Sequence, residues 1–273
     1  MKIAIDSSAN YKKIEGIKNS IVPMFITTKD RDFVDDENLD TLEMLDFLEK
    51  SNDKSGSSCP SVSSWMEAFE GDNEVIAITL TSALSGCNNA CNIAADEWKQ
   101  KDNRKIYVLD TMSIGPVEKL CVEYIKANQS DKEFDFLVAG LEDYCKNHLR
   151  IGYCLESLKN LANNGRIKPA VARIAETLGI RIVGDINESG ELAVRNKVRG
   201  RNQGMKKIFI NMKEDGYKGG KVIIDHCFAE DSAQLLASMI KEEYPLAEVN
   251  IGETTGICSF YAQRHGVVVG YEI

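Results

Sequence analysis

The fold class is clearest in one segment, Glu74-Val-Ile-Ala-Ile-Thr-Leu-Thr-Ser-Ala-Leu-Ser-Gly86. Its residues up to Leu80 are mostly apolar and rich in Val and Ile, which is typical of a strand buried on both faces. A turn rich in hydroxyl groups, Thr81–Gly86, follows the strand. The next stretch, Asn88–Lys99, places its apolar residues on one face of a helix. A strand, a polar turn and a helix in this order predict one unit of a parallel α/β sheet.

The same unit recurs on both sides of this segment. Lys2–Asp6 and Lys105–Asp110 are short apolar runs that end in aspartate, and Val117–Asn128 has helical periodicity. The carboxyl ends of parallel strands meet at one edge of a sheet, and functional loops gather there. We therefore predict a first domain over residues 1–150, built on a parallel sheet with its functional loops at that edge.

The second half of the chain has a different rhythm. Leu155–Leu161 and Pro169–Leu178 are predicted helices. Ile180–Ile186 and Glu191–Val198 flank a polar turn, which predicts a β-hairpin. The remaining predicted elements are a strand, a helix and two strands: Lys221–His226, Ser232–Glu243, Glu248–Gly252 and Val267–Glu272. This order predicts a second domain over residues 151–273, with a mixed sheet covered by helices on one side.

The composition is that of an ordinary globular protein. The chain has 273 residues, of which 43% are hydrophobic and 27% charged, and this excludes a disordered or collagen-like chain. Its formal net charge is -9. We expect no nucleic-acid partner, because binding to phosphates requires a basic face. Basic residues concentrate only in Arg195–Arg201, which we interpret as a solvated charge run, with docking of an anionic partner as the alternative.

Targeting and membrane signals are not visible in the sequence. The residues Met1–Ser8 form too short an apolar run for a signal peptide, and no window approaches the roughly 18 apolar residues of a membrane span. We expect a cytoplasmic protein whose eight cysteines are thiols. Cys87 and Cys91 lie one helical turn apart without a neighbouring histidine, so they predict packing within a helix and no metal site.

Cofactor motifs are also missing. The sequence has no GxGxxG after a strand, no GxxxxGK[ST], no HExxH and no GxSxG. Dinucleotide, P-loop, zinc-protease and α/β-hydrolase sites therefore lose their usual support, and we expect no cofactor. Glycines in Gly216–Lys221 are similar to a phosphate loop, but they precede a predicted strand and are interpreted as a turn.

Hydroxyl groups are placed where the predicted strands end. Ser85 is a candidate N-cap for the helix that follows, and the free N–H groups of a helix N-terminus attract anions. Ser55–Ser61 is a second serine cluster, in a loop fixed by Gly and Pro. Asp6–Ser8 and Asp110–Ser113 complete the set at the same edge. Taken alone, each cluster is as compatible with a plain helix cap or a linker as with a binding site.

Several of these stretches, in order over nearly the whole chain, resemble the successive motifs of the DegV family: Asp6–Asn10, Ser57–Ser61, Leu80–Gly86, Asp110–Ser113, Leu158–Ile167 and His226–Asp231. The resemblance implies an α/β/α first domain, a second domain with a mixed sheet, and one long-chain fatty acid bound between them. It also implies a non-catalytic bacterial protein that presents the fatty acid carboxylate to a separate ATP-dependent fatty acid kinase.

The resemblance further implies which residues hold the carboxylate. The serine-rich loop of the family falls on Ser57 and Ser58, the loop after the central strand on Ser85, and a family arginine on Arg166. The full set of candidates, with the last two as secondary ones, is Ser57, Ser58, Ser85, Gly86, Arg166, Ser82 and His265.

This chain departs from the family motifs at two places. Cys59 stands where the family loop usually has glutamine. Gly256–Tyr261 contains Cys258 and no histidine, where the family often has Gly-Thr-His-Thr-Gly, and His265 is the candidate substitute. Binding of a lipid tolerates such changes more easily than recognition by a kinase does.

Two other functions remain open from the residues alone. One is a serine-dependent acyl hydrolase, with Ser85 or Ser57 as nucleophile and His226 as the base. The other is a binder of another small carboxylate or phosphate ester at the same helix N-terminus. Burial of a tail of about fifteen methylenes would contribute on the order of 12 kcal/mol before ordering costs, so a lipid would bind mainly through its tail.

Overall fold

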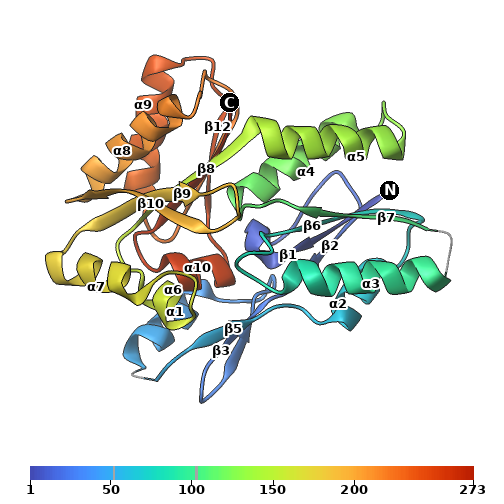
Figure 1. Cartoon of the computed structure of the whole chain (residues 1–273), viewed down its shortest axis with the longest axis horizontal. Coiled ribbons are helices and arrows are strands. Elements are labelled where there is room, and N and C mark those ends of the chain that lie inside the picture. Colours follow the sequence, from blue (N-terminus) through green and yellow to red (C-terminus); the bar gives the residue numbers. More distant parts are fainter. Residues whose placement is uncertain (52, 102–103) are drawn as a thin grey trace.

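The computed structural model of the chain describes residues 1–51, 53–101 and 104–273. Their strands form three sheets, which we call the parallel sheet, the mixed sheet and the small sheet (Figure 1). Within the described residues, no helix is both long enough and apolar enough to pass through a membrane.

The parallel sheet has the strand order β2-β1-β6-β7, and all its neighbouring strands run parallel. Its strands are β1 (Lys2–Asp6), β2 (Asn19–Val22), β6 (Glu74–Thr79) and β7 (Lys105–Asp110). The sheet lies between two pairs of helices (Figure 1). These are α2 (Val62–Ala68) with α3 (Cys87–Lys101), and α4 (Pro116–Asn128) with α5 (Phe134–Asp143). The predicted α/β class and its parallel sheet are confirmed.

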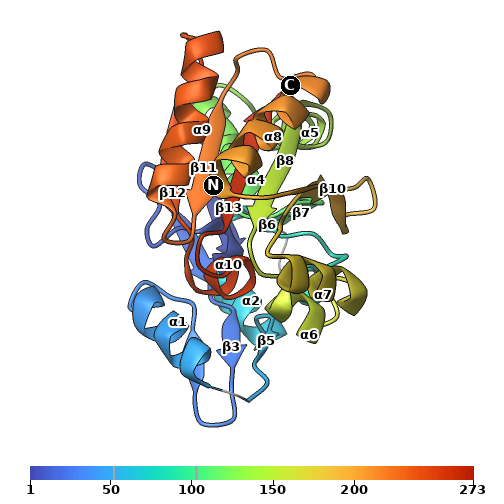
Figure 2. The same ribbon diagram turned by 90° about the vertical axis from the view of Figure 1, so that its left-hand side faces the viewer.

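The mixed sheet has the order β10-β9-β8-β13-β11-β12. Its strands are β8 (Leu149–Leu155), β9 (Arg181–Ile186), β10 (Leu192–Val198), β11 (Val222–His226), β12 (Val249–Glu253) and β13 (Val267–Glu272). Only β11 and β12 pair in parallel among these strands. The helices α8 (Arg201–Glu214) and α9 (Glu230–Glu243) lie side by side over one face (Figure 2). The mixed sheet and the β9–β10 hairpin agree with the prediction.

The other face of the mixed sheet is covered by α4, which follows the last strand of the parallel sheet. Gly270 makes this approach possible, because a Cβ atom there would lie about 2.9 Å from the backbone of Pro116. The sequence predicted helices on one side only. The helix that covers the second side belongs to the first half of the chain, which local periodicity cannot reveal.

The small sheet lies at the lower end of the molecule in Figures 1 and 2, beneath the two large sheets. β3 (Phe25–Thr27) pairs with β4 (Asp32–Val34) and with β5 (Gly56–Ser58), and α1 (Thr41–Lys50) follows β4. The short helices are α6 (Lys159–Asn163), α7 (Pro169–Leu178) and α10 (Gly256–Ala262). The small sheet was not predicted, because its strands are too short to show a period.

One predicted helix is wrong in its position. Leu155 was placed at the start of a helix, but it is the last residue of β8, and the helical part is only Lys159–Asn163. β8 is a short apolar run, mostly buried, that periodicity alone cannot distinguish from a buried helix.

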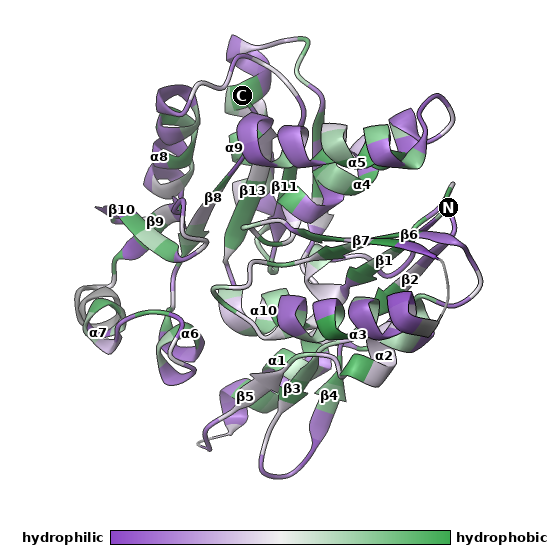
Figure 3. Cartoon of the chain, turned by 45° about the vertical axis from the view of Figure 1, so that its right-hand side comes forward, coloured by the Kyte–Doolittle hydropathy of each residue, from purple (hydrophilic) through white to green (hydrophobic). Residues whose placement is uncertain are grey.

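Figure 3 shows the apolar strands in the interior and hydrophilic residues on the outer turns of α3 and α8.

Candidate functional site

An apolar cavity lies where the two large sheets, the small sheet and α10 meet. Its volume is about 80 Å³. The space is therefore narrow. Its walls come from segments far apart in the sequence: Ser8, Met24, Ser57, Leu80, Leu84, Ser85, Ile114, Tyr153, Leu155, Leu161, Arg166, Leu192, Ile257, Cys258, Tyr261, Ala262 and Val268. Such a narrow apolar space suits an unbranched alkyl chain.

The cavity opens to the surface beside the loop after β6. A surface groove runs between the loop and start of α3 on one side and the segment from Ala162 to Val171 on the other. Four residues line both the groove and the cavity and so form the mouth of the cavity: Leu84, Ser85, Arg166 and Leu192.

Ser57 lies in β5, at the edge of the small sheet. It pairs with Ile26 of β3, and its hydroxyl shares a hydrogen bond of 2.7 Å with the hydroxyl of Tyr261. Successive side chains of a strand point to opposite faces. The neighbouring Ser58 is accordingly exposed and does not line the cavity. The structure thus separates two candidates that the serine-rich loop could not distinguish.

Ser85 lies at the mouth, directly before α3. The helix begins at Cys87, and the carbonyl of Gly86 accepts the hydrogen bond from the Ala90 N–H, so Gly86 takes the capping position predicted for Ser85. The hydroxyl of Ser85 accepts a hydrogen bond of 3.2 Å from the Cys87 N–H. Its own hydrogen remains available as a donor. Gly86 and Ser82 are exposed residues of the groove.

Arg166 closes the mouth from the opposite side. Its Nε donates a hydrogen bond of 3.1 Å to the carbonyl of Leu84, and its guanidinium also donates to the carbonyl of Asn164. The arginine therefore joins the loop after β6 to the segment after α6. At the same edge, the Thr81 hydroxyl donates to the carbonyl of Gly190 in the β9–β10 turn at 3.0 Å.

Neither of the two histidines proposed for the site lines the cavity. His265 has a positive φ of 70°, and its N–H donates to the carbonyl of Cys227 at 2.7 Å. His226 ends β11, where its Nδ1 accepts a hydrogen bond of 3.3 Å from the Ala229 N–H. Among the described residues that form the cavity walls there is no histidine. The geometry gives no support to a serine nucleophile with a histidine base.

The helix α10 supplies wall residues that sequence reasoning missed. Ile257, Cys258, Tyr261 and Ala262 all line the cavity. The spacing of Ile257 and Tyr261, four residues apart, is typical of one helix face and could have indicated this wall. The departure of this segment from the family motif hid the signal.

Cys258 contributes a neutral thiol to the wall. Its Sγ donates to the carbonyl of Ser8 at 3.2 Å, and burial raises the pKa of the thiol well above its usual value. The thiolate form is therefore disfavoured, and we assign the side chain a packing role. Cys87 and Cys91 are both buried in α3, and no metal-binding cluster occurs in the parts of the chain that the structure describes.

The basic segment Arg195–Arg201 extends from β10 to the start of α8, and its first arginine is ion-paired. Arg195 makes ion pairs with Asp185, Glu214 and Asp215, the last at 2.6 Å. Arg199 and Arg201 are exposed and agree with the solvated interpretation.

Asp35 fixes the N-terminus of α10. Its carboxylate accepts hydrogen bonds from the N–H groups of Gly256 and Ile257, at 2.7 and 2.9 Å. The side chain is buried, and this desolvation raises its pKa to about 6, against the opposing effect of these hydrogen bonds. The residue that orders α10 is therefore a carboxylate that gains a proton in mildly acidic solution.

This pKa predicts a pH dependence of stability. An acid whose pKa is higher in the folded than in the unfolded protein contributes stability below its unfolded pKa, and that contribution is lost as the pH rises through the folded value. From pH 4 to pH 6, the free energy of unfolding of the wild type should fall by about 2 kcal/mol relative to Asp35→Asn, which lacks this titration. Urea unfolding of both proteins at several pH values measures the difference. Parallel profiles would show that the pKa of Asp35 is not raised.

Comparisons with known proteins place the chain in a family. A family model for uncharacterised DegV proteins matches residues 1–272. A DegV domain-containing protein of Streptococcus pneumoniae is 31% identical over 278 residues, covering 100% of this chain and 99% of its own.

Three solved structures have the same fold. A DegV family protein of Eubacterium eligens, loaded with heptadecanoic acid, has a TM-score of 0.96 at 33% identity and covers 99% of each chain. The Fatty Acid Kinase (Fak) B3 protein of Streptococcus pneumoniae, loaded with linoleic acid, has a TM-score of 0.95 at 30% identity, over 100% of this chain and 99% of its own. A DegV family protein of Ruminococcus gnavus, refined with vaccenic acid, has a TM-score of 0.90 at 25% identity, over 98% of each chain. The chain described here belongs to the DegV family.

Proposed function

We propose that this protein binds one long-chain fatty acid in the apolar cavity and presents its carboxylate to a separate, ATP-dependent fatty acid kinase. In this proposal the chain is not itself catalytic. The hydroxyl groups of Ser57 and Ser85 hold the carboxylate, and the hydrocarbon tail lies along the apolar walls.

The observation that carries the proposal is the cavity itself, in a fold shared with fatty-acid-loaded structures at TM-scores of 0.96 and 0.95. Its walls are mostly aliphatic and aromatic, so burial of each methylene contributes about 0.8 kcal/mol. One of these similar structures is named as a fatty acid kinase protein, which supports a kinase as the partner.

The mouth of the cavity is suited to presentation of the carboxylate. Ser85 and Arg166 lie both in the cavity and in the surface groove, so a carboxylate held at Ser85 would be within reach of a partner docked in the groove. Gly86 and Ser82 line the groove and would face that partner. Ser58 and His265 take no part, because neither lines the cavity.

We further propose a division of the chain into domains of residues 1–150 and 151–273, and a cytoplasmic location. The first strand of the mixed sheet begins at Leu149, and the parallel sheet ends at Asp110, which supports this boundary. The cysteines Cys59, Cys87 and Cys258, like the others, are free thiols, as expected in a compartment that also supplies ATP.

The proposal predicts that a Ser57→Ala, Ser85→Ala double variant loses its fatty acid. On solvent extraction and mass spectrometry, the wild-type protein should release a stoichiometric amount of fatty acid, and the variant should release far less. The fatty acid carboxylate has lost two hydrogen bonds in the variant, and a hydrogen bond to a charged group contributes about 1.5–3 kcal/mol. With a fatty acid kinase and ATP, only the wild type should support formation of acyl phosphate.

Ser58→Ala is the matched control, since its exposed side chain belongs to the same loop and should leave both results unchanged. A wild type that is empty and takes up neither oleate nor palmitate contradicts lipid binding and favours a smaller carboxylate or phosphate ester. If the wild type carries a fatty acid that no kinase phosphorylates, only the proposal of a kinase partner is contradicted.

A further inference from the structure

We infer that Tyr261 belongs to the carboxylate site: its hydroxyl and that of Ser57 form a pair that supplies one hydrogen-bond donor to the carboxylate, and this pair makes the site select a free fatty acid over a neutral ester. This inference rests on the proposed function and adds a specificity-determining residue to it. Its basis is the hydroxyl pair that Tyr261 forms with Ser57 inside the cavity.

The pair has one donor more than it uses. Each hydroxyl carries one hydrogen, and the bond of 2.7 Å between Ser57 Oγ and Tyr261 Oη consumes one of them. Within the described part of the chain, no other hydrogen bond is made by either hydroxyl. One O–H group therefore remains available at this point of the cavity wall.

The other hydroxyls that face the cavity are already committed as donors, with Ser85 as the exception. Tyr153 donates to the carbonyl of Ala193 at 2.8 Å, and Ser8 donates to Oε2 of Glu118 at 2.7 Å. A donor without an acceptor in apolar surroundings is costly, and a carboxylate oxygen is the acceptor that compensates it most strongly. The two free donors, one from the Ser57–Tyr261 pair and one from Ser85, thus mark the carboxylate end.

Tyr261 is held in place before any ligand arrives. Asp35 fixes the start of α10, and Asn160 of α6 donates its Nδ2–H to the carbonyl of Phe260 at 2.7 Å. The buried ring of Phe260 packs edge-on against the ring of Tyr261, with centroids 4.8 Å apart. Because the phenol is already ordered, binding costs little conformational entropy at this residue.

The charge around the pair explains the selectivity. Arg166 is the only cationic residue among the described cavity walls, and its guanidinium already donates to the carbonyls of Leu84 and Asn164. At Ser57 and Tyr261 the donors are neutral hydroxyls. These bind an ionised carboxylate much more strongly than an uncharged ester, whose oxygens are weaker acceptors.

The test compares palmitate with methyl palmitate on the wild type and on Tyr261→Phe, which removes only the hydroxyl. We expect Tyr261→Phe to bind palmitate about 10-fold more weakly, at the lower end of the range for a hydrogen bond to a charged group because Ser57 keeps its own hydroxyl, with the affinity for methyl palmitate unchanged. Displacement of a fluorescent fatty acid measures both dissociation constants, and thermal unfolding verifies the fold.

Tyr153→Phe is the matched control, because its ring also lines the cavity but its hydroxyl donates to Ala193. It should preserve the ratio of the two affinities. The inference would be overturned if Tyr261→Phe lost affinity equally for palmitate and methyl palmitate, or for neither, because the ratio of the two affinities would then equal that of the wild type. A wild type that binds neither ligand would contradict the proposed function instead.

Discussion

Val268→Phe should reduce the affinity for a long-chain fatty acid by about 100-fold or more. Val268 is a buried residue of β13 whose side chain lines the cavity, whereas its neighbours Val267 and Val269 pack on the opposite face of the mixed sheet, in the core under α8 and α9. The phenyl ring would fill space that the tail needs. It adds about four carbon atoms, and loss of about four buried methylenes corresponds to roughly 3 kcal/mol at about 0.8 kcal/mol each.

The fold should tolerate this change. A larger side chain in a filled core costs about 1–3 kcal/mol, but here the ring enters space that no atom occupies, and phenylalanine is favourable in a strand. Fatty acid content after extraction and the dissociation constant for added palmitate measure the effect.

Val34→Phe provides the control, because Val34 is an exposed strand residue that does not line the cavity. Its affinity for palmitate should equal that of the wild type. Unchanged binding in a folded Val268→Phe protein would show that the tail lies elsewhere, and the cavity would then lose its proposed role.

The edge of the parallel sheet was largely predictable from sequence. Strands ending at Asp6, Thr79 and Asp110 are short apolar runs followed by polar turns, and parallel pairing must bring their ends together. The structure confirms this, since Asp6 accepts a hydrogen bond from the Leu80 N–H and the Thr81 N–H donates to the carbonyl of Ser113. Periodicity and turn chemistry are local signals, and this edge is built from them.

The walls opposite that edge could not be predicted in the same way. Ser57 reaches the cavity only because β5 pairs with β3, and Tyr261 meets it from a position 204 residues away in the chain. Both depend on long-range packing of elements too short to have a clear period. The resemblance to a family identified Ser57 but not Tyr261, because the segment around Tyr261 differs from the family motif.

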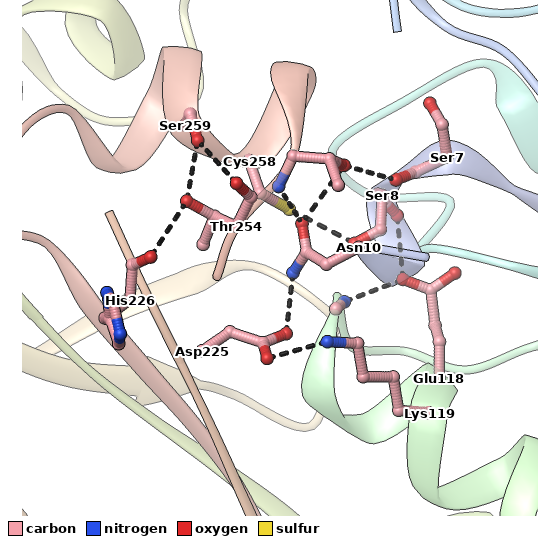
Figure 4. Close-up of polar contacts among 12 residues, drawn as sticks. Ser7, Ser8, Asn10, Glu118, Lys119, Asp225, His226, Thr254, Cys258 and Ser259 are labelled. Carbon is pink, nitrogen blue, oxygen red and sulfur yellow. Dashed lines mark hydrogen bonds and ion pairs between the residues drawn. The ribbon is translucent and has the colours of Figure 1, made fainter. Parts of the chain in front are cut away.

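A buried polar network connects the two large sheets (Figure 4), and two of its residues, Ser8 and Cys258, line the cavity. Asp225 of β11 is completely buried, and its carboxylate accepts hydrogen bonds from Lys119 Nζ at 2.7 Å and from Asn10 Nδ2 at 2.8 Å. Asn10 follows β1, and its Oδ1 also accepts the N–H of Thr255, just before α10. The network therefore connects both sheets to the helix that carries Tyr261.

Lys119→Met should destabilise the protein by about 3–5 kcal/mol, because it leaves the Asp225 carboxylate buried without its cation. Burial already raises the pKa of Asp225, while Lys119 lowers it, so removal of the lysine should raise it further. The double variant Lys119→Met, Asp225→Asn has no charge at these two positions, and residue 225 still accepts the hydrogen bond from Asn10. Its free energy of unfolding in urea should return to within about 1 kcal/mol of the wild type, since well-packed neutral groups replace buried ion pairs at little cost. If the double variant were as unstable as Lys119→Met, the loss would come from packing around the lysine stem and not from the unpaired carboxylate.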